Sequence, residues 1–122
     1  MITKESAAKF AYDWIAAWNA HNLTQILSHY ADDFEMTSPF IAKLAVAPSG
    51  TLKGKDAIGD YWKKAFEKFP DLHFELIDVF SGMDSVCIYY KSVLGLLAVE
   101  WFHFDHAGKV SKAIAHYNEF PK

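Results

Sequence analysis

The sequence predicts an α+β domain in which three N-terminal helices pack into the concave face of a curved antiparallel sheet. In the first half, apolar residues recur every three or four positions, as they do on one face of a helix. The last third alternates apolar and polar residues in runs separated by tight turns, which is typical of strands. Helices come first, strands follow, and we find no linker or repeat. We therefore interpret residues 1–122 as one domain.

Three helices are expected in the first half of the chain. The first covers residues 4–20, where Thr3 can cap the helix and one face gathers apolar side chains, namely Ala7, Phe10, Ala11, Trp14, Ala17 and Trp18. The second covers 23–30, and the third runs from about 55 to 69. A short strand is expected at 34–38. We interpret 40–53 as a long loop, of a length that often forms a lid or rim.

An antiparallel meander is expected at residues 72–80, 85–94, 96–105 and 110–120, with a hairpin around Gly95. If the hairpin loop has an even number of residues, Glu100 shares one face with Lys91, Tyr89 and Phe102. Placing Glu100 inward makes the opposite face apolar, with Ile77, Val79, Val86, Ile88, Tyr90, Val99, Trp101 and Ile114. An exposed apolar face of that size favours a homodimer through the outer side of the sheet.

Composition excludes several classes of function. The net charge is -3 and the basic residues are all lysines, so a nucleic-acid partner is not expected. The single cysteine, Cys87, cannot form an internal disulfide, and no Cys/His spacing suggests a metal or cofactor site. We also find no apolar leader and no run long enough to span a membrane. The expectation is a cytoplasmic protein without a membrane partner.

Five segments together carry a resemblance to a known family. They are "WIAAWNAHNL" (14–23), "HYADDFEMTSP" (29–39), "GTLKGKDAIGDYW" (50–62), "FPDLHFEL" (69–76) and "DHAGKV" (105–110). In this order they resemble the SnoaL-like group of the nuclear transport factor 2-like superfamily. The resemblance implies a cone formed by a curved sheet, closed by helices around a mostly apolar pocket, with a homodimer through the outer sheet face.

The same resemblance restricts the chemistry. In the ketosteroid isomerase branch, the general base is an aspartate just before the proline of the second segment, and Ser38 stands there in this chain. The tyrosine that this branch uses on the first helix is replaced by Trp14, whereas its buried acid on the third strand of the meander corresponds to Glu100. The resemblance therefore argues against isomerase chemistry of that type. Epoxide hydrolase members use an Asp-Arg-Asp arrangement, which a chain without arginine excludes.

The candidate catalytic residues are Glu100 and Lys91. In apolar surroundings a glutamate has a raised pKa and a lysine a lowered one, so such a pair could act as acid and base. The alternative interpretation is a half-solvated ion pair between strands, which contributes little to the stability of the fold. A bulge or a loop with an odd number of residues would separate the two side chains.

The candidate ligand-binding residues are mostly wide aromatic side chains that could line the cone, namely Trp14, Trp18, Tyr30, Ser38, Trp62, Phe66, Phe74, Tyr89, Phe102 and Tyr117. The alternative for each aromatic is plain core packing. We expect a small apolar or aromatic molecule in the cone, with acid/base chemistry of the isomerase, dehydratase or cyclase kind. A non-catalytic binding module and a protein-interaction domain remain alternatives, because a fold does not choose among functions.

Overall fold

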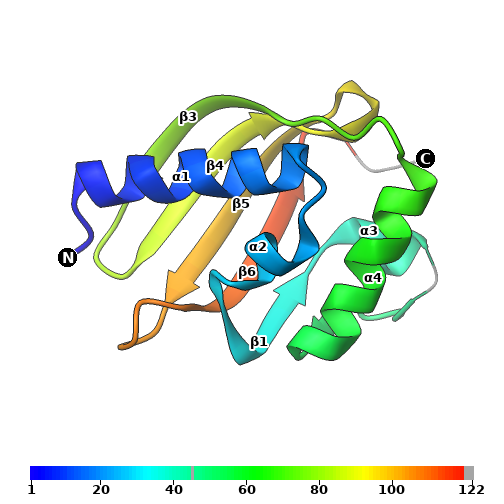
Figure 1. Ribbon diagram of the computed structural model, residues 1–122, viewed down its shortest axis with the longest axis horizontal. Helices are drawn as coiled ribbons and strands as arrows, with labels where there is room; N and C mark the ends of the chain where they lie inside the picture. The colour runs from blue at the N-terminus through cyan, green and yellow to red at the C-terminus, as the bar shows by residue number, and fades with distance from the viewer. Residues whose placement is uncertain (45, 120–122) are drawn as a thin grey trace.

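The computed structural model describes residues 1–44 and 46–119, and it confirms the α+β fold class. In chain order the elements are α1 Lys4–Asn19, α2 Leu23–Leu27, β1 Tyr30–Thr37, α3 Pro39–Lys43, β2 Thr51–Lys53, α4 Lys55–Lys68, β3 Glu75–Ser81, β4 Ser85–Lys91, the 3₁₀ turn η1 Val93–Gly95, β5 Leu97–Phe104 and β6 Val110–Tyr117. The helices cover the concave face of a curved sheet, and α1 crosses in front of β3, β4, β5 and β6 (Figure 1). We call this assembly the cone.

The strand order in the sheet is β2-β1-β6-β5-β4-β3. The predicted antiparallel meander is present as β3 to β6, and β1 joins it by pairing in parallel with β6. Strand β1 begins earlier than predicted, at Tyr30, and it contains the exposed residues Asp32 and Asp33. The register between β1 and β6 shifts between Tyr30 and Glu35, and such an irregularity accommodates extra residues in one strand.

The segment predicted as the loop 40–53 holds regular structure. Pro39 is the first residue of α3, a position where proline costs no hydrogen bond, and the hydroxyl of Ser38 accepts from the backbone N–H of Phe40 at 3.2 Å. Both Phe40 and Ile41 are buried, so α3 forms part of the wall of the cone. Strand β2 then pairs with β1. The expectation of a long loop is therefore wrong for these parts of the segment.

Helix α1 follows its predicted pattern closely. The hydroxyl of Thr3 accepts from the backbone N–H of Ser6 at 3.0 Å and caps the helix, and the buried residues of α1 are the six that the sequence predicts. Its apolar face packs against the inner side of the sheet, where it meets the side chains of β4 and β5. Among the helices that the structure describes, none has the length and apolar character needed to cross a bilayer.

The hairpin between β4 and β5 corrects the predicted register. The connection runs from Ser92 to Leu96, an odd number of residues, and Leu94 and Gly95 both adopt left-handed backbone angles, with φ of 59° and 72°. An odd loop reverses which β4 residues share a face with Glu100. Four residues expected on the outer face therefore point into the core instead, namely Val79, Val86, Ile88 and Tyr90.

Candidate functional site

A small cavity lies inside the cone, between α1, α3 and α4 on one side and the inner face of the sheet on the other. Its volume is about 60 Å³. That space holds a few water molecules and is well below the ~300–1,000 Å³ of pockets for drug-sized ligands. Aromatic and aliphatic side chains dominate the wall, with several hydroxyl groups and a carboxyl group, and the lining residues are Trp14, Trp18, Met36, Ser38, Phe40, Leu44, Tyr61, Trp62, Ala65, Phe69, Leu72, Phe74, Tyr90, Ser92, Val93, Glu100 and Tyr117.

Glu100 supplies the carboxyl group of this cavity. It projects from β5, between Ile88 of β4 and Ala115 of β6, and only 3% of it is exposed. Burial raises the pKa of Glu100 from 4.5 to about 7, and the hydroxyl of Tyr90, which donates to Oε1 at 3.1 Å, offsets part of that rise. Both protonation states of this carboxyl group are therefore populated near neutral pH.

Three tyrosines share the cavity wall with Glu100. Burial raises the pKa of Tyr61, Tyr90 and Tyr117 in each case, and the negative charge of Glu100 raises each of them further. The hydroxyl of Ser38 lowers the pKa of Tyr61 and Tyr117 somewhat, which places Ser38 close to both hydroxyls. These phenols stay neutral at physiological pH, so each keeps a hydroxyl that can donate a hydrogen bond, and the hydroxyl of Tyr90 donates to Glu100.

The predicted ligand-binding residues fall into three positions. Six line the cavity, namely Trp14, Trp18, Ser38, Trp62, Phe74 and Tyr117. Three lie behind this wall. The hydroxyl of Tyr30 accepts a hydrogen bond from the indole nitrogen of Trp14, Phe66 packs against Trp18, and Phe102 packs edge-to-face against Trp14. For these three, packing of the core is the interpretation that the geometry favours. The tenth residue, Tyr89, lies on the outer face of the sheet.

The predicted neighbours of Glu100 on β4 are wrong. Lys91 is exposed and lies opposite Leu97, and Tyr89 lies opposite Val99 on the outer face. The cause is the odd number of residues between β4 and β5, which turns Tyr90 inward and its two neighbours outward. No acid/base pair of Lys91 with Glu100 is formed. Ile88 lies opposite Glu100, and the polar side chain of β4 that contacts the carboxyl group is the neutral phenol of Tyr90.

Sequence reasoning missed three polar residues of the wall, Tyr61, Tyr90 and Ser92. For Tyr90 and Ser92 a signal existed, because a connection of three to five residues that contains glycine is an established alternative to a two-residue hairpin turn. For Tyr61 the signal was the helical period, because Ile58, Tyr61, Trp62 and Ala65 stand at positions i, i+3, i+4 and i+7 on one face of α4.

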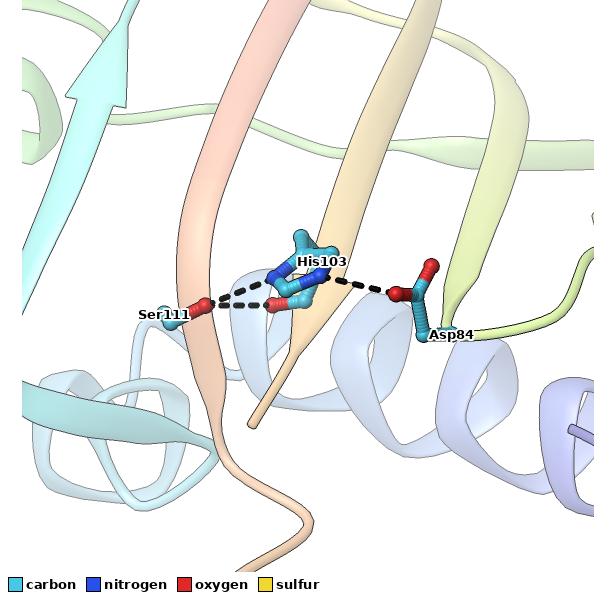
Figure 2. Close-up of polar contacts among 3 residues, drawn as sticks. All are labelled: Asp84, His103 and Ser111. Carbon is cyan, nitrogen blue, oxygen red and sulfur yellow. Dashed lines mark hydrogen bonds and ion pairs between the residues drawn. The ribbon is translucent and has the colours of Figure 1, made fainter. Parts of the chain in front are cut away.

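A second polar cluster lies on the outer face of the sheet (Figure 2). Oγ of Ser111 is 2.9 Å from Nδ1 of His103, and Nε2 of His103 is 3.1 Å from Oδ2 of Asp84. An irregularity in the β5–β6 register places Ser111 beside His103, where its hydroxyl also reaches the carbonyl of His103 at 3.3 Å. These residue types can build a hydrolytic triad, yet the Asp84 side chain is 67% exposed. We therefore interpret the cluster as a surface hydrogen-bond network between strands rather than a catalytic triad. Exposed ion pairs of this kind contribute little to the stability of a protein.

A groove of about 510 Å³ opens beside the N-terminal half of α1, against Phe10, Phe104 and His29. Burial lowers the pKa of His29, and its Nε2 is buried without a hydrogen-bond partner. The charged side chains of α1 that line this groove, Lys9 and Asp13, are exposed and pair with each other at 2.8 Å. The cone remains the stronger candidate because it combines a buried acid with a ring of neutral donors.

The arrangement in the cone can exchange a proton with a bound molecule. The carboxyl group accepts a proton when ionised and donates one when protonated, and the surrounding phenols can hold an oxygen atom of a ligand in place. Within residues 1–44 and 46–119, no three His, Cys, Asp or Glu side chains gather where they could hold a metal ion.

The chain matches the SnoaL-like domain family over residues 11–113. Among solved structures, it is similar to a SnoaL-like protein of unknown function from Burkholderia thailandensis, with 52% sequence identity and a TM-score of 0.93, over 97% of this chain and 98% of that one. A search of functionally curated proteins finds no significant match.

More distant structures share the fold alone. One is a protein of unknown function with a cystatin-like fold from Methylobium petroleophilum, 16% identical, with a TM-score of 0.75 over 99% of this chain and 80% of that one. Another, from Kribbella flavida, is provisionally assigned as a ketosteroid isomerase; it is 16% identical, with a TM-score of 0.73 over 97% of this chain and 82% of that one. The family match and the close relative together show that the chain belongs to the SnoaL-like family.

Proposed function

We propose that this protein binds a small, largely apolar molecule in the cone and that Glu100 exchanges a proton with it. The observation that carries the proposal is a carboxyl group that lines the cavity, is almost fully buried, and has a pKa raised to about 7. A group that titrates near the working pH is the most effective general acid or base. Such a pKa is more frequent at functional sites than elsewhere in proteins.

The surroundings of Glu100 favour a reaction at a carbonyl group. Neutral hydroxyls of Tyr61, Tyr90 and Tyr117 could stabilise negative charge that develops on a carbonyl oxygen, as donors in a water-poor cavity do. Glu100, when ionised, could then remove a proton from the adjacent carbon. Isomerases, dehydratases and cyclases share this step, so the proposal covers the family's range of chemistry without choosing one reaction.

A non-catalytic binding module is the second candidate, and the small cavity favours it. A volume of about 60 Å³ leaves little space for a large substrate, and Oε1 of Glu100 is already engaged by Tyr90. In this alternative the carboxyl group only orients the ligand.

Proton exchange at carbon separates the two candidates. Cyclohexanone in D₂O would be mixed with the protein, and loss of its α-proton signals followed by NMR. For an acid/base enzyme we expect protein-dependent exchange whose rate rises with pH through about 7, the pKa of Glu100, and Glu100→Gln should abolish the exchange while leaving affinity almost unchanged. The matched control is Glu75→Gln, because Glu75 is an exposed carboxylate of β3 away from the cavity.

Two other results would revise the proposal. Full exchange in Glu100→Gln would remove Glu100 from the acid/base role. Binding of cyclohexanone without any protein-dependent exchange would favour the binding module instead.

We further propose a homodimer through the outer sheet face and a location in the cytoplasm. The outer face of β4, β5 and β6 carries a group of neighbouring apolar or weakly polar side chains, namely Cys87, Tyr89, Val99, Trp101 and Ile114. Covering such a face with a second copy would remove it from water. The single cysteine, unpaired in this structure, suits a reducing compartment.

A further inference from the structure

The indole nitrogen of Trp18 is a buried donor without a partner. Trp18 lies on α1 and is 5% exposed, and its Nε1 has no hydrogen-bond partner among the described residues. Leaving a buried donor unpaired costs about 1–3 kcal/mol, and the large majority of buried polar side-chain atoms are paired. The N–H group therefore requires an explanation.

Trp14, one turn earlier on the same helix, provides the contrast. Its Nε1 donates to the hydroxyl of Tyr30 at 2.9 Å, and its ring lies 5.9 Å from the ring of Trp18. The two tryptophans therefore share a helix and an aromatic cluster but differ in whether the N–H group is satisfied. A phenylalanine at position 18 would supply an aromatic ring without a buried, unpaired donor.

Trp18 lies in the wall of the cavity that also contains Glu100. Its ring packs against Trp62, Phe66 and Phe74 at centroid distances of 5.2 to 5.3 Å, so the N–H group lies in apolar surroundings. In such surroundings a hydrogen bond to an incoming acceptor is electrostatically stronger than in bulk water.

The charges of the wall restrict what that acceptor can be. Among the described residues that line the cavity there is a carboxyl group, Glu100, but no lysine and no histidine. An anionic ligand would face this carboxyl group without a balancing cation. An ammonium group has no lone pair to accept the indole proton. A neutral oxygen acceptor satisfies both conditions.

We infer that Trp18 selects the ligand of the cone by donating its Nε1–H to the oxygen of a small neutral molecule, such as a ketone, an ester or a cyclic ether. The apolar part of this molecule lies against Trp62 and Phe74. The inference rests on the proposed function, because it requires the cone to be the binding site. It adds the chemical class of the ligand and the residue that recognises it.

The test compares two probes of the same shape, cyclohexanone and methylenecyclohexane, in which a CH₂ group replaces the oxygen. The ¹⁵N-labelled protein has 4 tryptophans, and the indole resonance of Trp18 is identified by its loss in Trp18→Phe. We expect cyclohexanone to move this resonance downfield more than the other indole resonances. Trp18→Phe should bind cyclohexanone about tenfold more weakly, and methylenecyclohexane with nearly unchanged affinity.

Trp101→Phe is the matched control, because Trp101 lies on the outer face of the sheet and is not part of the cavity wall. It should retain the wild-type preference for cyclohexanone over methylenecyclohexane. If cyclohexanone shifts the amide resonances of Ser38 and Tyr117 but leaves the Trp18 indole unmoved, and Trp18→Phe binds it equally well, the inference is wrong while binding in the cone stands. If neither probe nor γ-butyrolactone perturbs any resonance of the cavity wall at millimolar concentration, binding in the cone fails and this inference fails with it.

Discussion

Replacing Glu100 by glutamine should stabilise the protein at alkaline pH and leave its stability nearly unchanged at acid pH. Glutamine has the shape of the protonated carboxylic acid and keeps an oxygen that can accept from Tyr90, as Oε1 of Glu100 does at 3.1 Å. It cannot ionise, however. The comparison therefore isolates the free-energy cost of a negative charge inside the cone.

The magnitude follows from the pKa. Glu100 has a pKa of 4.5 in the unfolded chain and about 7 when folded, mainly because of burial. The folded state holds the proton more tightly, so the stability linked to protonation is complete below about pH 4.5 and is lost as the pH rises through about 7. The loss is about 3 kcal/mol, since a difference of one in pKa is worth about 1.4 kcal/mol. Glu100→Gln should escape this loss.

The assay is urea unfolding of wild type and Glu100→Gln at a series of pH values between about 4.5 and 8.5. The free energies of unfolding should agree at the acid end and diverge in favour of the glutamine variant by up to about 3 kcal/mol at the alkaline end. Glu75→Gln, which changes an exposed carboxylate, should show no such divergence. A constant difference between Glu100→Gln and wild type across the range would refute a raised pKa at Glu100.

Three further predictions test the packing, the outer face and the register. Trp14→Phe should lower the free energy of unfolding by about 1–3 kcal/mol more than Trp18→Phe in urea titrations, because it leaves the Tyr30 hydroxyl without its partner; equal losses would contradict this. Trp101→Glu should convert a wild-type dimer into a monomer in analytical ultracentrifugation, because it places a charge on the apolar outer face. A wild-type protein that is monomeric at micromolar concentration would contradict the proposed dimer. Lys91→Met should leave binding and proton exchange with cyclohexanone unchanged, because Lys91 is exposed and outside the cavity wall; a large loss would contradict the observed register.

Local sequence patterns were sufficient to predict the two long helices, α1 and α4. The buried face of α1 could be predicted residue by residue, because a helix has a fixed period and its apolar positions recur on one side whatever it packs against. The end of α4 near Pro70 follows in the same way from local chemistry. The 40–53 segment was harder, because α3 is a helix of only 5 residues stabilised by a Ser38 cap and by burial of Phe40. Short elements of this kind depend more on tertiary contacts than on pattern.

The candidate site was predictable only in part. Glu100 came from a family resemblance combined with its place on a strand, and the structure places it in the cavity wall. Its hydrogen-bond partner, Tyr90, could not be predicted. The β4 side chains that share a face with Glu100 depend on the number of residues in the single loop between β4 and β5. Sequence offered no way to distinguish Trp14 from Trp18, since whether an indole N–H is paired depends on Tyr30, which is distant in the chain.

By itself, the sequence determined the α+β class, the meander, the buried face of α1 and the absence of arginine, because each follows from composition or from a local period. Only the tertiary structure decided that Tyr90 rather than Lys91 accompanies Glu100, that the cavity is small, and that Trp18 keeps an unpaired donor. The physical reason is common to all three. Strand register, residual volume and hydrogen-bond pairing are relations between segments far apart in the chain, and they are fixed only when those segments pack together.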